Sequence, residues 1–589
     1  MKRTSFISRL IFAALIAILP GCGEEGGVCQ LEQRECSSVC VNLATDPNNC
    51  GLCSNACGTA MTCVVGECVP AAAICTLPEE RCGESGCVNT QTSAAHCGTC
   101  DAACSANADC VTGECAEPLA VMQTSLNDRE LDRDLFVLND VTFQLTKINT
   151  ATFFASRVID HVVLPDGSLI LVAAETEDVF ELYHASPRGG ALTKLNPTLV
   201  SGGDVLAGLA VSRDGSKVLY RADQDTDGVI DLYAVTLANP GASVKVNGAL
   251  VTDGSVSRVF EVSADGSRAA YVADQDIDGL DEAFVVDLST ATPGASTKLN
   301  PPLVSSSIFE LKLSSDGTKV VYRADHDVPG APQLYVVDVA SPGVANRIAN
   351  PDGADYQADA YLITPDSLAV IYTGGTGFFQ ESLWRVPLVA PPLDSTLLVD
   401  GGEGFSGVRP DLAISDDSVR VYFRKRNEAT NLDQVFRVNI AFPDVVTLLS
   451  SPDDSVVADT DDFVLSADEQ SLVFRTGGDG GEGGNPSRPG TEEPDQNRTL
   501  SPALFHVDLT VMTPPTLLSP PPGKSEGIGS RYFATNDRRA LYRADHDVPG
   551  HSDVYLATVA APGVVTKVSP PLDRATDSTD VSILSGFRR

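Results

Sequence analysis

Apolar and polar positions alternate in short runs over most of the chain, and the same series of features returns about every fifty residues. The clearest copies are 207–235, 259–286 and 309–337. Each contains an alternating strand, a Ser-x-Asp-Gly turn, a second apolar strand, an acidic loop and a third strand. A short fourth strand follows, as at 193–196. Because long runs with a 3.6-residue period are missing, the pattern predicts tandem four-stranded sheets.

Two residue types mark the copies. The turn aspartate recurs at Asp166, Asp214, Asp265, Asp316, Asp366, Asp417, Asp468 and Asp537. An aromatic residue recurs in the third strand at Phe136, Tyr183, Tyr233, Phe284, Tyr335, Trp384, Phe436, Phe505 and Tyr555. Asp-Gly favours a tight hairpin because glycine accepts a positive φ. Two later copies read Asp366-Ser367 and Asp468-Glu469, where we expect another turn type. The regular aromatic spacing indicates packing between sheets.

One four-stranded sheet cannot bury both its faces, so tandem sheets stack around an axis. The sequence therefore predicts an all-β fold with a β-propeller over 120–589. Residues 120–148 supply the second to fourth strands of one blade, and 578–587 supply the first strand that this blade lacks. Joining the two ends removes the open edge and gives nine blades. Eight blades with one appended hairpin is the alternative.

The repeated turn, followed by Asp-x-Tyr as at Asp231-Leu-Tyr233, resembles the WD40-like repeats of TolB and of propellers in prolyl-oligopeptidase-type enzymes. The resemblance covers 155–575 and implies a propeller fold. It specifies no single function, because one fold hosts many.

The first residues predict export. Basic residues precede an apolar run at 10–19, which is too short to span a bilayer. The run ends in Leu19-Pro20-Gly21-Cys22, which resembles the lipobox of bacterial lipoproteins. That resemblance implies a signal peptide over 1–21, a lipid on Cys22 and a linker over 22–28. Gly23 at the next position favours the outer membrane, so we expect a cell-envelope protein anchored by its lipid.

All other cysteines fall into two sets of eight within 29–115, with nearly the same spacing in each set. They are Cys29, Cys36, Cys40, Cys50, Cys53, Cys57, Cys63 and Cys68, and then Cys75, Cys82, Cys87, Cys97, Cys100, Cys104, Cys110 and Cys115. Each unit has few large apolar residues, so cross-links must stabilise it in an oxidising compartment. We expect four disulfides per unit and leave their pairing open.

Two other interpretations of the cysteines are weaker. Zinc could use Cys50-x-x-Cys53 and Cys97-x-x-Cys100, but eight thiols per unit outside the cell favour disulfides. A redox Cys-x-x-Cys requires a thioredoxin-like context that the sequence lacks. The pattern resembles cysteine-rich repeats near the N-terminus of bacterial surface lipoproteins, which implies a stiff stalk.

The net charge of −38 makes nucleic acid a poor partner. Cations, or a basic patch on another protein, suit this field better. An insertion at 477–499, rich in glycine, proline and glutamate, is predicted to be disordered.

Two acidic loops predict calcium. Carboxylates stand at positions 1, 3, 5 and 9, glycine at 6, and a backbone carbonyl serves at 7. The first set is Asp223, Asp225, Asp227, Val229 and Asp231, and the second is Asp274, Asp276, Asp278, Leu280 and Glu282. The pattern resembles the cages of integrin-type propellers and the first nine positions of an EF-hand loop. It lacks the bidentate glutamate at position 12, so we expect weak binding, on the order of 10⁻⁴–10⁻³ M. A solvated acidic loop without metal is the alternative.

The copies at 325–330 and 545–550 place proline at the third ligand position, so we expect no metal there. We therefore interpret His326 and His546 as ordinary polar loop residues.

Enzyme motifs such as a Gly-x-Ser-x-Gly elbow or His-Glu-x-x-His are absent from the sequence. The first hypothesis is a monomeric binding or scaffold lipoprotein that takes a protein, peptide or glycan ligand. A hydrolase or lyase with a site in the central channel is one alternative. A TolB-like periplasmic accessory protein is another.

Overall fold

The computed structural model forms two compact units, residues 1–103 and 104–589, and each is considered by itself. The structure describes residues 32–59, 61–70, 79–82, 87–104, 108–125, 133–148, 158–176, 179–303, 307–325, 332–348, 357–375, 381–388, 395–402, 407–427, 432–450, 460–477, 502–511, 514–520, 528–529, 531–535, 538–548, 551–569 and 580–586, with single positions 29, 75 and 330. The predicted signal peptide, Cys22 and nearly all of the 477–499 insertion lie outside these residues. Within them, no helix has the length and apolar character needed to cross a membrane.

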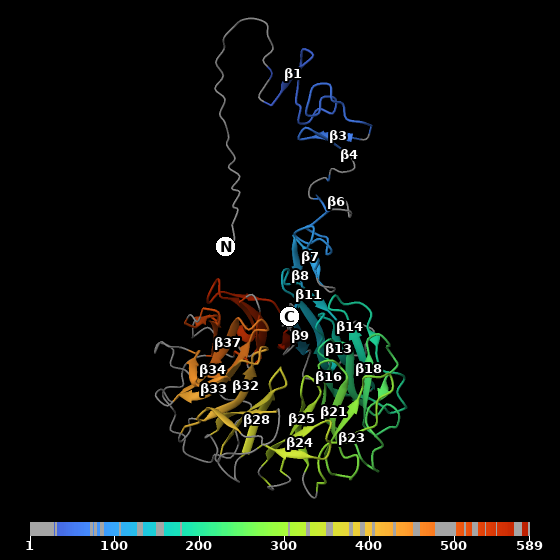
Figure 1. Ribbon diagram of the computed structural model, residues 1–589, viewed down its shortest axis with the longest axis vertical. Helices are drawn as coiled ribbons and strands as arrows, with labels where there is room; N and C mark the ends of the chain where they lie inside the picture. The colour runs from blue at the N-terminus through green and yellow to red at the C-terminus, as the bar shows by residue number, and fades with distance from the viewer. Residues whose placement is uncertain are drawn as a thin grey trace. The chain divides into compact units, whose positions relative to one another are not determined.

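The first unit consists of short two-stranded ribbons (Figure 1). Its strands are β1 (Arg34–Cys36), β2 (Val39–Val41), β3 (Met61–Val64), β4 (Glu67–Pro70), β5 (Glu80–Arg81) and β6 (Cys87–Val88). Disulfides join Cys29–Cys40, Cys36–Cys53, Cys50–Cys63, Cys57–Cys68, Cys75–Cys87 and Cys82–Cys100. Since both sulfurs of each Cys-x-x-Cys pair are disulfide-bonded, they are not available as zinc thiolates.

The second unit begins with a ribbon of β7 (Asp109–Val111) and β8 (Glu114–Ala116), beside the Cys104–Cys115 disulfide. Cys97 and Cys110 are disulfide-bonded as well, so all sixteen cysteines after Cys22 are oxidised, as the spacing predicted.

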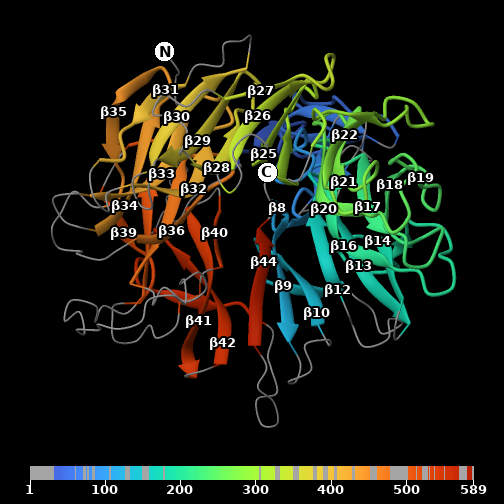
Figure 2. The same cartoon turned by 90° about the horizontal axis from the view of Figure 1, so that it is seen from below.

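Nine four-stranded antiparallel sheets follow, which confirms the predicted propeller and its nine blades (Figure 2). From the innermost strand outward, blade 1 is β44 (Asp580–Gly586), β9 (Pro118–Ser125), β10 (Arg133–Asn139) and β11 (Leu145–Lys147); blade 2 is β12 (Val158–Val163), β13 (Leu169–Thr176), β14 (Val179–Ala185) and β15 (Thr193–Lys194); blade 3 is β16 (Val205–Val211), β17 (Lys217–Ala222), β18 (Asp231–Thr236) and β19 (Val244–Lys245). Blade 4 is β20 (Val256–Val262), β21 (Arg268–Ala273), β22 (Glu282–Asp287) and β23 (Thr297–Lys298); blade 5 is β24 (Ile308–Leu313), β25 (Lys319–Ala324), β26 (Gln333–Asp338) and β27 (Ala345–Arg347); blade 6 is β28 (Gln357–Ile363), β29 (Ala369–Gly375), β30 (Ser382–Pro387) and β31 (Thr396–Val399). Blade 7 is β32 (Val408–Ile414), β33 (Arg420–Asn427), β34 (Leu432–Asn439) and β35 (Phe442–Leu448); blade 8 is β36 (Thr460–Leu465), β37 (Ser471–Thr476), β38 (Ala503–Asp508) and β39 (Thr516–Leu517); blade 9 is β40 (Tyr532–Ala534), β41 (Arg539–Val548), β42 (His551–Thr558) and β43 (Val565–Lys567).

The C-terminal strand closes the ring, as predicted. β44 pairs with β9 in antiparallel register, with Gln123 opposite Ser582 and Thr124 opposite Val581. The two ends of the repeat region therefore share one blade, so neither end leaves an unpaired inner strand.

The recurring aromatics pack as predicted. Tyr335 of β26 lies opposite Tyr322 of β25, and their ring centroids are 5.4 Å apart in a stacked arrangement. Both belong to a core cluster with Val272 and Val285 of the preceding blade. Each aromatic pair thus fills the space between two blades, and such pairs add to the stability gained from buried area.

The repeated serine explains the Ser-x-Asp-Gly turn. Ser212 Oγ donates to Asp214 Oδ1 (2.6 Å) and accepts the N–H of Lys217 (3.0 Å). Gly215, between them, has a φ of +72°. The hydroxyl therefore closes the hairpin and holds the aspartate at once.

The expectation of another turn type at the later copies was wrong. Ser367 and Glu469 occupy the glycine position with φ of +64° and +55°. The Ser367 hydroxyl accepts the N–H of Asp316 in the preceding blade (3.2 Å), and Glu469 accepts that of Asp416. A hydrogen bond between blades thus offsets the steric cost of a left-handed backbone, about 1–2 kcal/mol.

Candidate functional site

The innermost strands differ from the rest of each blade. Along β16 every residue but the first is partly exposed, whereas β17 beside it is buried except at its first position. The same contrast holds for β36 and β37. Figure 2 shows these first strands nearest the axis of the ring. We call their accessible side chains, with the second-strand groups that contact them, the inner wall.

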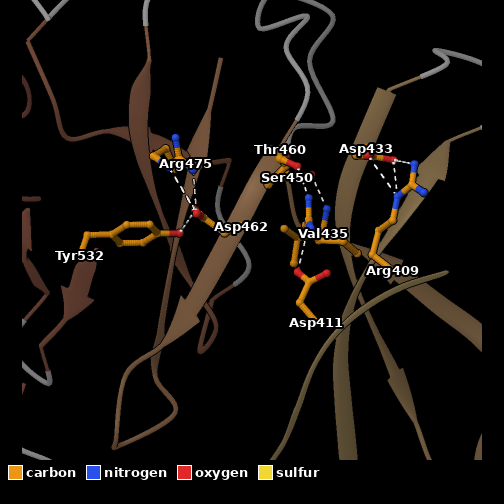
Figure 3. Close-up of polar contacts among 10 residues, drawn as sticks. Arg409, Asp411, Asp433, Val435, Ser450, Thr460, Asp462, Arg475 and Tyr532 are labelled. Atoms are coloured by element: carbon orange, nitrogen blue, oxygen red, sulfur yellow. Dashed lines mark hydrogen bonds and ion pairs between the residues drawn. The ribbon is translucent and has the colours of Figure 1, made fainter. Parts of the chain in front are cut away.

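Arg424 of β33 organises the inner wall at blade 7, where Figure 3 labels its partners Asp411 and Thr460. Its Nε donates to Asp411 of β32, and its Nη1 donates to the carbonyl of Thr460 in β36 (2.7 Å). One guanidinium thus joins a carboxylate of its own blade to the backbone of the next. Burial raises the pKa of Asp411 above its usual range, although Arg424 opposes the shift.

Blade 8 repeats the arrangement and extends it to blade 9. Arg475 Nη2 lies 2.8 Å from Asp462 Oδ2, and Arg475 Nη1 lies 3.3 Å from Asp461 Oδ2. The buried Tyr532 of β40 donates its hydroxyl to Asp462 Oδ1 (2.8 Å). Burial raises the pKa of Tyr532 well above its usual value, so the phenol stays a donor.

In this region the carboxylate side chains are more exposed than the arginine side chains that bind them. The Asp411 side chain is 33% exposed against 16% for Arg424, and Asp462 is 30% exposed against 12% for Arg475. A solute at the inner wall of blades 7 and 8 therefore meets carboxylates whose positions are fixed by the arginines behind them, although Oδ1 of Asp411 is itself buried and has no hydrogen-bond partner.

Blades 4 to 6 carry a second polar region. Lys312 Nζ lies 3.5 Å from Glu310 Oε1 and 5.6 Å from the centre of the Tyr361 ring. Burial, and then the charge of Glu381, raise the pKa of Asp359 to about 6. A carboxyl group with such a pKa is protonated at mildly acidic pH, where an ordinary aspartate is already ionised.

The arginine that bridges blades is a repeated feature. The second-strand arginine donates Nη1 to the carbonyl of a residue in the next inner strand, from Arg221 to Val256 (3.0 Å), from Arg323 to Ala358 (3.3 Å) and from Arg424 to Thr460 (2.7 Å). A recurrent Tyr-Arg-Ala at the end of the second strand marks Arg221 and Arg323 in the sequence, but Arg424 follows Phe423 and carries no such signal.

The two predicted calcium loops have the expected turn. Gly228 has a φ of +79° and donates its N–H to Asp223 Oδ2 (3.0 Å), and Gly279 has a φ of +74° and donates to Asp274 Oδ2 (3.4 Å). The next predicted ligands are all solvent-accessible, namely Asp225, Asp227, Val229, Asp276, Asp278 and Leu280.

The ninth position has a different partner in each loop. Asp231 is buried, with Lys245 on Oδ2 (2.6 Å) and Asn247 on Oδ1 (2.8 Å). Glu282 is also buried and pairs Oε1 with Lys298, but its Oε2 is buried without a hydrogen-bond partner. An orphan oxygen of this kind suits a cation, so the second loop keeps an acceptor that the first loop lacks. A cation there would displace Lys298, whose Nζ also lies 3.3 Å from Asp276 Oδ2.

In the part of the chain that the structure describes, only cysteine sulfurs form groups of three potential ligand atoms within 4.8 Å. A cation would therefore have to draw the loop carboxylates together, and the calcium sites stay predictions.

The residue after the first loop aspartate has a structural role. Gln224 accepts the hydroxyl proton of buried Tyr220 (2.7 Å), and Gln275 accepts that of Tyr271 (2.8 Å). His546 takes the same place beside Tyr542 in blade 9 (2.8 Å). The interpretation of His546 as an ordinary loop residue was therefore incomplete, because it satisfies a buried phenol.

Comparisons with known proteins leave the activity open. The family described as "Stigma-specific STIG1-like protein family" matches residues 19–71, the region of the first cysteine repeat. No curated protein matches the chain.

Similar solved structures include the tricorn protease, at 14% identity over 75% of this chain and 42% of that chain, with a TM-score of 0.32. TolB from Acinetobacter baumannii matches at 14% identity over 46% of this chain and 61% of that one, with a TM-score of 0.26. An oligogalacturonate lyase matches at 14% identity over 63% of this chain and 93% of that one, with a TM-score of 0.35. The chain spans less than half the length of the tricorn protease.

By its fold the chain is an all-β protein with a nine-bladed propeller and a disulfide-rich N-terminal region. Its structural neighbours include TolB-like propellers.

Proposed function

We propose that the chain is a cell-envelope lipoprotein, anchored through Cys22, whose propeller binds a basic polypeptide segment at the inner wall. The observation that carries the binding role is the row of carboxylates held in front of arginines at blades 7 and 8. Acceptors fixed before binding lower the ordering cost for a ligand rich in N–H donors. The net charge of −38 adds long-range attraction for a cationic segment.

The binding proposal is tested with matched peptides and glycans. We expect basic peptides to bind, with affinity that falls as salt rises, and neutral glycans and acidic peptides not to bind. The double variant Asp411→Asn/Asp462→Asn should lose at least tenfold in affinity, because each substitution removes a charge-assisted contact worth about 1.5–3 kcal/mol. Asp253→Asn, at an exposed turn with no proposed role, is the control and should bind as the wild type does. Equal affinity of the wild type, the double variant and the control variant would contradict the proposal.

The anchor has its own test. Cells that express the wild type with labelled palmitate should label the protein and place it in the outer-membrane fraction, and Cys22→Ala should abolish the label. An unlabelled wild type would contradict the anchor. A TolB-like accessory role would differ from this proposal in its partners, and crosslinking in intact envelopes followed by partner identification distinguishes the two.

A channel enzyme is the second candidate, and the raised carboxyl pKa values favour it. Burial raises the pKa of Glu261 and Asp411, and burial with Glu381 raises that of Asp359 to about 6. Such groups could donate a proton to a leaving group near neutral pH. A turnover screen with peptides and acidic glycans, wild type against Asp359→Asn, tests this candidate, and equal rates would exclude Asp359 as the acid.

A further inference from the structure

The first cysteine repeat exposes large apolar side chains that its small core does not use. Val39 is 60% exposed, Leu52 65% and Val65 84%. Single exposed apolar residues are common, but a group of them on a unit of this size indicates a contact surface.

These three residues surround one place in the repeat. Gly51 and Gly66 touch so closely that a Cβ on Gly51 would lie 2.4 Å from the Gly66 carbonyl oxygen. Leu52 and Val65 are the chain neighbours of these two glycines. Val39 lies opposite Cys36 in the β1–β2 ribbon, and Cys36 is disulfide-bonded to Cys53, the residue after Leu52.

Val65 also adopts an unfavourable backbone. Its φ is +50° at the tip of the β3–β4 hairpin, a conformation that is rare for a β-branched residue. The repeat therefore holds its most exposed apolar side chain at a strained tip.

The second repeat provides an internal comparison. It has the same disulfide pattern in the pairs Cys75–Cys87, Cys82–Cys100 and Cys104–Cys115. At the positions of Val39, Leu52 and Val65 it has Gly86, Thr99 and Thr112. The scaffold thus forms without apolar residues at these positions, so their presence in the first repeat serves something other than folding.

We propose that Val39, Leu52 and Val65 form a membrane-contact surface that inserts into the boundary between head groups and acyl chains. The proposal rests on the proposed anchor, because it takes the membrane that holds Cys22 as the occupant. Seven chain steps separate Cys22 from Cys29, so the repeat starts at most about 25 Å from the lipid, at ~3.5 Å per residue. The second repeat starts 46 residues later and has lost the surface.

We expect the membrane-contact surface to prefer zwitterionic lipids. Glu24 and Glu25 lie in the linker, and the whole chain carries a charge of −38, so anionic head groups would repel it. Apolar insertion must therefore supply the attraction, without help from basic residues.

The test uses the chain from residue 23 onward, expressed without the signal peptide, in flotation with phosphatidylcholine vesicles. Neither an acyl group nor the apolar run at 10–19 then contributes to binding. We expect the unacylated chain to float with the vesicles, and less so when phosphatidylglycerol is added. The double variant Leu52→Thr/Val65→Thr takes its residues from the second repeat and should bind on the order of 100-fold more weakly, about tenfold per side chain. Phe442→Ser/Val445→Ser removes two apolar side chains of equal exposure from β35 (65% and 64%) and should leave flotation unchanged.

Failure of the unacylated chain to float, or equal flotation of the threonine variant, would overturn the proposal. An equal loss of vesicle binding in the β35 control variant would also overturn it, because the binding would then be nonspecific hydrophobic adsorption. Palmitate labelling of the wild type tests the lipid anchor on Cys22 independently of the vesicle experiment. If labelling fails while vesicle binding persists, the anchor is wrong and the contact surface remains.

Discussion

Replacing Arg424 by methionine removes the guanidinium that joins blades 7 and 8 and keeps most of the aliphatic stem. Two groups lose their partner at once. The Asp411 carboxylate loses the Nε donor, and the Thr460 carbonyl, on a residue that is 2% exposed, loses the Nη1 donor. The variant therefore tests whether the inner wall is held by this bridge.

The magnitude follows from burial. Breaking a fully buried ion pair costs about 3–5 kcal/mol, and Asp411 keeps a third of its side chain exposed, which lowers its share to about 2 kcal/mol. An unpaired buried carbonyl adds about 1 kcal/mol. We expect Arg424→Met to lower the free energy of unfolding by about 3 kcal/mol at neutral pH. Arg188→Met removes an exposed pair with Asp109 and should change it by less than about 0.5 kcal/mol.

The pH dependence has a definite sign. Burial already raises the pKa of Asp411 in the folded protein, and loss of Arg424 raises it further. A folded pKa above the unfolded one means that the folded state binds more protons, so stability falls as pH rises through that range. The deficit of the variant should therefore be largest at pH 7–8 and shrink on acidification toward pH 5.

The assay is urea denaturation with disulfides intact, at several pH values, for wild type, Arg424→Met, Asp411→Asn and the double variant. The double variant should be more stable than the sum of the two single effects predicts, because the charge that Arg424 compensates is gone. A deficit below 1 kcal/mol, or one independent of pH, would refute the bridge.

Three further predictions concern the loops and turns. Calcium titrated by calorimetry should bind weakly and lose its heat in Glu282→Gln but not in Asp231→Asn; equal loss in both would contradict the difference between the loops. Ser418→Ala should lower the free energy of unfolding by about 1 kcal/mol, because Ser418 Oγ accepts the N–H of Asp366 (3.0 Å), and an unchanged or stabilised variant would contradict this role. Tyr271→Phe should cost about 1–2 kcal/mol, because it leaves Gln275 without its phenol partner, and a neutral result would show that water replaces the bond.

The repeat and the closure of the ring were predictable because both depend on local patterns. The Ser-x-Asp-Gly turns, the aromatics and the unmatched strands at the two ends determine the number of blades, and the structure has the same nine. The exceptions at Ser367 and Glu469 were not predictable from the turn alone, because their side chains bond to the preceding blade.

The contacts of the inner wall were not predictable from the sequence for a related reason. Arg424 and Asp411 are 13 residues apart on different strands, and the Arg424 bond to Thr460 crosses between blades. The partners of the acidic loops were not predictable for the same reason, since spacing alone could not show that Lys245 and Asn247 bind Asp231.

Closure of the ring is the claim on which the inner wall and its proposed ligand depend, and one crosslink tests it. Gln123 of β9 and Ser582 of β44 are register partners. Cysteines at neighbouring positions of paired strands come close enough for a disulfide. The variant Gln123→Cys/Ser582→Cys should yield a disulfide-linked peptide pair by mass spectrometry after digestion, and a higher melting temperature than either single variant. Free thiols at both positions in the folded protein would contradict the closed nine-bladed ring.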